Sequence, residues 1–120
     1  MRVRIATAAV VLAAAISLPA YAWHNHLVKS LPAESEEMAA SPAMIQLWFA
    51  EKVEPKFSSI TLMTADSTRL EIAKPKGTDD PKSITADVPA KLAAGSYLIR
   101  WRTAGDDGHA VRGTYPFSVK

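Results

Sequence analysis

The feature that most constrains the fold of this chain is a series of short runs in which apolar and polar side chains alternate. In the run 97–102, Tyr97, Ile99 and Trp101 occupy every second position and share one face, and Arg100 and Arg102 share the other. A period of two predicts a β-strand with one buried face and one exposed face. Residues 23–120 contain no helical period of four turns or more, so the pattern favours strands throughout.

Six further runs have the length and composition of strands, and they span residues 27–31, 43–49, 57–63, 69–72, 83–88 and 113–119. Eight prolines and five glycines punctuate the chain. The stretches 33–42, 74–82 and 89–95 are therefore predicted to be loops. Seven short strands at this spacing predict an all-β, single-domain fold, a Greek-key β-sandwich or partly closed barrel of about seven antiparallel strands.

Several large side chains have an expected place in this fold. Four aromatic residues on the predicted strands are expected to pack in the core: Phe49, Tyr97, Trp101 and Phe117. Met44 and Met63 also fall in predicted strands, and we expect them to pack there. Pro116 interrupts the last strand and has no N–H to donate, so an edge or a bulge is expected at this position.

The first 22 residues have the organisation of a secretory signal peptide. Two arginines stand within Met1–Arg4, an apolar run follows over residues 5–18, and Ala20 and Ala22 are the small residues of an A-x-A cleavage site. The apolar run is shorter than the roughly 20 residues that span a bilayer. We therefore predict cleavage after Ala22, export, and a mature domain of residues 23–120. A retained membrane anchor or a buried helix is the alternative.

The charge balance argues against nucleic acid as a partner. The whole chain has 14 basic and 12 acidic residues. Removal of residues 1–22 takes away Arg2 and Arg4, and the basic residues then equal the acidic ones in number. A nucleic-acid-binding domain needs a basic face that contacts phosphates, and a nearly neutral mature chain does not supply one.

The absence of cysteine restricts both the source of stability and the chemistry of the chain. An exported domain of this size without disulfides must rely on its apolar core. Metal sites that need thiolates, such as iron–sulfur clusters and zinc fingers, are excluded. Any metal ligands must therefore come from histidines, carboxylates and a few methionines.

The three histidines stand in two places that a β-sandwich can bring together. His24 and His26 lie at the predicted mature N-terminus, and His109 lies in a loop before the last strand. Loops cluster at the poles of a sandwich. Asp107 adds a carboxylate two residues before His109, and the free α-amine, of pKa near ~8, adds a nitrogen. Imidazoles, an amine and a carboxylate suit a tetragonal site that favours copper(II). The alternative is that these histidines are only solvated side chains.

The strongest motifs are the start His24-Asn25-His26-Leu27 and the closing Asp107-Gly108-His109, together with the segments 45–51, 53–58 and 92–102. In these segments the sequence resembles the CopC family of periplasmic copper-resistance proteins, over essentially all of residues 23–120. The resemblance implies a small Greek-key β-barrel in the periplasm. It implies that His24, Asp107 and His109 bind copper(II), and that Glu51 lies beside the site and orients a ligand or a water. It also implies an inner-membrane copper transporter as a partner.

Two features depart from the pattern of that family. Trp23 precedes His24, so after cleavage the free amine belongs to Trp23 and forms chelate rings with the His24 backbone nitrogen and imidazole. Alternatively His26 takes part, since on an extended segment it points to the same side as His24. The methionines after residue 22 are also scattered over positions 38, 44 and 63. We therefore expect no separate copper(I) site.

These observations predict a protein that carries or sequesters copper(II) as a monomer and is not an enzyme. Two other functions fit parts of the sequence. A copper-dependent oxidative enzyme would use a similar chelate of histidine and amine, but it needs a broad substrate face, for which a domain of this size has little room. A β-sandwich that only mediates protein interactions would leave the histidines without a role.

Overall fold

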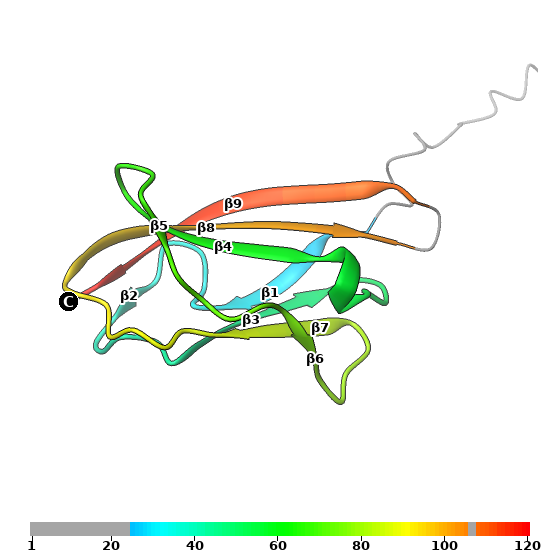
Figure 1. Cartoon of the computed structure of the whole chain (residues 1–120), viewed down its shortest axis with the longest axis horizontal. Helices are drawn as coiled ribbons and strands as arrows, with labels where there is room; N and C mark the ends of the chain where they lie inside the picture. The colour runs from blue at the N-terminus through cyan, green and yellow to red at the C-terminus, as the bar shows by residue number, and fades with distance from the viewer. Residues whose placement is uncertain (1–24, 106–107) are drawn as a thin grey trace, which may run out of the picture.

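The chain folds into two β-sheets that pack face to face, as the computed structural model shows for residues 25–105 and 108–120 (Figure 1). The first sheet has the strand order β1 (Leu27–Leu31), β3 (Met44–Phe49), β7 (Ser83–Asp87), β6 (Lys76–Gly77). The second has the order β2 (Glu37–Met38), β9 (Ala110–Val119), β8 (Gly95–Ala104), β4 (Ser59–Thr64), β5 (Arg69–Leu70). The predicted all-β sandwich is confirmed.

The core forms between the sheets from every second residue of the long strands. On β8, Tyr97, Ile99 and Trp101 are buried, and Arg100 and Arg102 on the other face are exposed. All four aromatic residues assigned to the core are buried, so this prediction is confirmed. Phe49 and Trp101 connect the two sheets through an edge-to-face contact with ring centroids 5.2 Å apart. Such contacts stabilise the sandwich beyond the apolar area that they bury.

Several element boundaries differ from the prediction. Strands β2 and β6 have two residues each and lie inside the predicted loops 33–42 and 74–82. Pairing between β2 and β9 is parallel, so not every strand pair is antiparallel. The strand predicted at 57–63 begins at Ser59, because Pro55–Phe57 form the short 3₁₀ helix η2. A two-residue strand has no alternation by which a sequence could reveal it.

Strands β8 and β9 form a hairpin that is longer than predicted. Its ten residue pairs run from Gly95 and Val119 to Ala104 and Ala110. Among the described residues, the far side of β9 meets another strand only where β2 pairs with Ser118 and Val119. Pro116 lies on the part of β9 that no second strand flanks, as its missing N–H predicts. For most of its length β9 is therefore an edge strand.

The two strand methionines have different surroundings. Met63 on β4 is 2% exposed, so its packing role is confirmed. Met44, the first residue of β3, is 40% exposed, and its predicted packing is wrong. A residue at the start of a strand and on its outer face has few neighbours to pack against. Among residues 25–105 and 108–120, no helix is long and apolar enough to cross a membrane.

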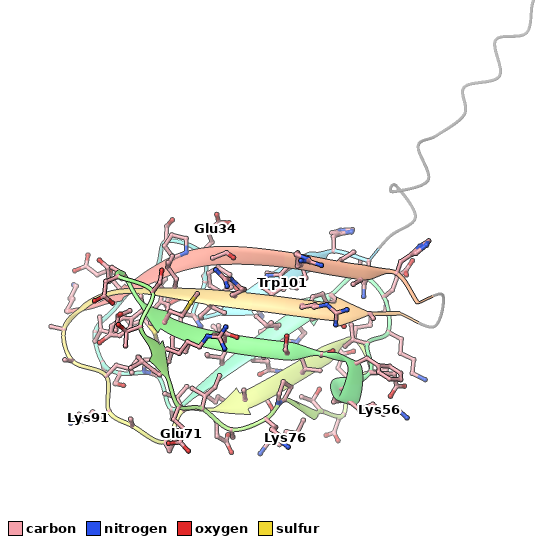
Figure 2. The ribbon with its side chains drawn as sticks, turned by 45° about the horizontal axis from the view of Figure 1, so that its top comes forward. Glu34, Lys56, Glu71, Lys76, Lys91 and Trp101 are labelled. Carbon is pink, nitrogen blue, oxygen red and sulfur yellow. The ribbon has the colours of Figure 1, made fainter. Side chains whose placement is uncertain are left out.

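Two ends of the sandwich can be distinguished. At one end β1 begins beside the end of β3, because Leu27 pairs with Phe49. The hydroxyl oxygens of Ser58 and Thr103 lie 2.8 Å apart, so the connection after β3 lies beside the end of β8. We call this end, formed by residues 25–26, 50–58, 103–105 and 108–110, the turn end; it is on the right of Figure 1. In Figure 2, Lys56 marks the turn end and Lys91 marks the opposite end.

Candidate metal centre

The segment that leads into β1 is fixed at the turn end by the side chain of Asn25. Its Nδ2 donates a hydrogen bond to the carbonyl oxygen of Glu51 at 3.2 Å, and its Oδ1 accepts one from the Glu51 N–H at 2.8 Å. The carbonyl of His26 accepts a further bond from the Ala50 N–H at 2.9 Å. The residues just before β1 are therefore held against the connection that follows β3.

His26 lies directly beside this contact. Its backbone N–H donates to Oδ1 of Asn25 at 3.0 Å, and its side chain is exposed. The peptide unit is thus held in place while the imidazole remains at the surface. An exposed imidazole can bind a metal ion without the cost of removing a buried group from its packing.

His109 approaches the turn end from the second sheet, immediately before β9. The Gly108 N–H donates to the carbonyl of Gly105 at 3.0 Å, and the Gly105 N–H donates to the carbonyl of His109 at 3.3 Å. Gly108 has a φ of 78°, in the left-handed region that favours glycine. These bonds hold the exposed His109 directly before β9, at the turn end of the β8–β9 hairpin.

The structure places some of the predicted site residues and leaves others outside its description. His26, Glu51 and His109 all lie at the turn end and are exposed. Trp23, His24 and Asp107 lie outside the described residues, so their roles stay predictions. Among residues 25–105 and 108–120, no group of three histidine, aspartate or glutamate side chains could hold a metal ion.

Strands β1 and β9 lie on either side of one groove. Its volume is about 590 Å³, and its lining includes Leu27 and Val28 of β1 with Gly113 and Tyr115 of β9. Trp101, labelled in Figure 2, lines the same groove from β8. Because both strands run from the turn end toward the opposite end, the residues that precede β1 and β9 lie on the same side of the molecule.

The tyrosine in this groove is part of the core. Tyr115 is 3% exposed, and burial raises the pKa of its phenol to about 12. Burial thus favours the neutral phenol in the folded protein. The Glu51 carboxylate differs, because it is exposed and makes no ion pair in the described part of the chain. It is available to a cation or to a metal-bound water.

Sequence reasoning did not identify Asn25. It stands between two histidines, and only its neighbours attract attention as ligand types. One signal was available: an asparagine two residues before a strand can bond to backbone groups with its side chain. The sequence does not reveal which backbone it meets, because Glu51 lies 26 residues away.

Comparison with known proteins identifies the fold and its relatives. The CopC domain model matches residues 27–120. The crystal structure of CopC from Methylosinus trichosporium OB3b has a TM-score of 0.75 and 38% identity, and the match covers 81% of this chain and 94% of that one. "Copper resistance protein C" of Xanthomonas campestris pv. juglandis is 34% identical, with 97% of this chain and 95% of that protein covered.

A third relative is much longer than this chain. "Copper transport protein CutJ" of Bacillus subtilis (strain 168) is 32% identical over 97 residues, which are 80% of this chain and 18% of that protein. The family model alone spans far more than half of the sequence, and the first relative is matched over nearly its whole length. The chain therefore belongs to the CopC family.

Proposed function

We propose that this protein binds one copper(II) ion at the turn end, with His24, Asp107 and His109 as ligands. The free amine of Trp23 or the imidazole of His26 completes the set. This proposal rests on the predicted ligand types, two imidazoles, a carboxylate and an amine, which together favour copper(II) over other divalent ions. Glu51, at the same end, is proposed to orient a ligand or a metal-bound water.

Copper binding follows from membership of the CopC family, whose proteins bind copper and are not enzymes. The chain has a sequestering role in copper resistance, as the name of its relative indicates. A copper-dependent oxidative enzyme and a β-sandwich that only mediates interactions do not fit this family.

One observation carries the choice of site. The backbone at Asn25–His26 is bonded to residues 50–51, and His109 precedes β9 at the same end of the sandwich. His24 directly precedes Asn25 in the sequence, and Asp107 is two residues before His109. This supports the proposal that ligands from two segments distant in sequence bind one ion at this end.

The cellular setting is part of the proposal. CopC proteins are periplasmic, and residues 1–22 are proposed as a signal peptide that is cleaved after Ala22. Residues 23–120 would then be the mature copper-binding domain, acting as a monomer. An inner-membrane copper transporter is the proposed partner. The match to a short part of CutJ supports this choice, because that protein is named for copper transport.

Copper titration of the exported protein tests the site. We expect one equivalent of copper(II) to bind to residues 23–120, and His109→Ala to weaken binding at least tenfold, because one imidazole is lost. His24→Ala and His26→Ala, measured separately, decide which of the two imidazoles ligates. N-terminal sequencing of the same sample identifies the free amine. Absence of stoichiometric binding, or unchanged affinity in His109→Ala, would overturn the proposal.

A further inference from the structure

We propose that Asn25 is a positioning residue for the metal site, and that its carboxamide determines where the N-terminal ligands stand. This inference rests on the proposed function, since it concerns the same copper ion. Asn25 itself contributes no metal ligand. Its role is to hold the backbone from which His24 and His26 extend.

The bonding pattern of Asn25 is that of a further rung in the β1–β3 ladder. The last backbone bond of this edge joins the His26 carbonyl to the Ala50 N–H. One residue further on, the Asn25 side chain bonds to both the N–H and the carbonyl of Glu51. A carboxamide has the same planar donor and acceptor as a peptide group. The backbone bonds of the ladder end at His26, and the Asn25 side chain makes the next pair of bonds in their place.

Other side chains of similar size cannot make this pair of bonds. Aspartate has acceptors only, and its carboxylate would oppose the Glu51 carbonyl oxygen. Leucine matches asparagine in shape but has neither donor nor acceptor. Oδ1 of Asn25 also accepts from the His26 N–H, so a single oxygen orders two peptide units. Asparagine is therefore chemically specific at this position.

The consequence for copper is preorganisation. Without the carboxamide, the described residues before β1 keep one backbone bond to the β3 connection, at His26. The conformational freedom regained by the segment must be lost again when copper binds, and this lowers the affinity. The same two bonds also fix the backbone of Glu51, so one side chain positions both the N-terminal ligands and the nearby carboxylate.

The test compares Asn25→Ala and Asn25→Leu with the wild type and with Ser41→Ala. Ser41 Oγ accepts a bond from the Leu92 N–H at 2.7 Å at the opposite end of the sandwich. Its removal therefore deletes a comparable long-range bond from side chain to backbone, far from the copper site. Copper(II) affinity is measured by competition with a chelator, the geometry of the bound ion by electron paramagnetic resonance, and the Glu51 amide by hydrogen exchange in the metal-free protein.

We expect both Asn25 variants to weaken copper(II) binding about tenfold, the effect of ordering about one freed backbone residue when copper binds. Their resonance spectra should show more than one copper species, and the Glu51 amide should exchange faster. Ser41→Ala should keep the wild-type affinity and spectrum. Asn25 variants that match Ser41→Ala in affinity and spectrum would overturn the positioning role and leave the copper site intact. Failure of the wild type to bind copper would instead reject the proposed function.

Discussion

The two arms that lead to the turn end are built in different ways. One is the β8–β9 hairpin, in which ten residue pairs hold the chain up to the reversal before His109. The other is the start of β1, an edge strand whose register shifts between Leu27 and Lys29 and whose last contacts are a backbone bond and the Asn25 side chain. A ladder spreads its strength over many bonds, whereas the β1 arm depends on few.

This difference has a direct consequence for the site. Mutations in the hairpin should act mainly on the stability of the whole domain, because its strands contain much of the core. Mutations near Asn25 should act mainly on copper binding and little on stability. In the proposed site the hairpin is thus the scaffold, and the β1 arm is the part that is more easily moved. Mutations placed in one arm or the other should therefore separate the effect on domain stability from the effect on copper affinity.

The largest stability effect is expected at Gly113 of β9. This residue lies opposite Trp101, and an added Cβ would lie 2.6 Å from Cζ2 of the indole ring. Gly113→Ala should therefore lower the free energy of unfolding by about 2–3 kcal/mol, the cost of overpacking a core. Denaturant unfolding, monitored by tryptophan fluorescence, measures it.

Gly77→Ala is the matched control for Gly113→Ala. Its added Cβ would meet only Pro55 Cγ at 3.5 Å, an ordinary contact distance. We expect a change within about 0.5 kcal/mol. Equal losses of stability in the two variants would contradict the close approach of Trp101 to β9. So would a Gly113→Ala protein as stable as the wild type.

The next effect in size concerns Tyr115, on the same strand. Burial raises the pKa of its phenol to about 12, above the ordinary value of 10. Between these values the unfolded chain loses the proton and the folded chain keeps it. The free energy of unfolding should therefore fall as pH rises, by up to about 1.4 kcal/mol per pH unit, and about 2 kcal/mol in all.

Other groups also titrate in alkaline solution, so the contribution of the Tyr115 phenol must be isolated. Tyr115→Phe does this, because it removes that hydroxyl and leaves the other titrating groups in place. The difference in stability between wild type and variant should be constant below pH 10 and should then shift in favour of the variant. Chemical unfolding at a series of pH values measures the difference. A difference that stays constant up to pH 12 would show that the phenol titrates normally and that the β1–β9 groove is open to water there.

The contrast between the arms also explains what the sequence could predict. The alternation in 97–102 identifies β8 and its buried aromatic residues, since a long amphipathic strand repeats its signal several times. Strands β2 and β6 have two residues each and repeat nothing. The candidate site shows the same contrast. A histidine can be predicted as a metal ligand from its residue type alone. The role of Asn25 depends on a bond to a residue 26 positions away, which no local pattern encodes.

The smallest effect tests how the hairpin is joined to the connection after β3. Ser58 Oγ donates to the Glu54 carbonyl at 2.7 Å and lies 2.8 Å from Oγ1 of Thr103, which is almost fully buried. Ser58→Ala leaves the Thr103 hydroxyl without this partner, so we expect a loss of about 1 kcal/mol in the free energy of unfolding.

A second change separates the lost bond from lost packing. In Ser58→Ala combined with Thr103→Val, no hydroxyl remains to be satisfied, and the double variant should be at least as stable as Ser58→Ala alone. If the Ser58–Thr103 contact joins the two arms rigidly, Ser58→Ala should also weaken copper binding. If the arms reach the ion independently, affinity should stay at the wild-type value while stability falls. The comparison of the arms favours the second result, because the β1 arm contacts Glu51 and not Ser58.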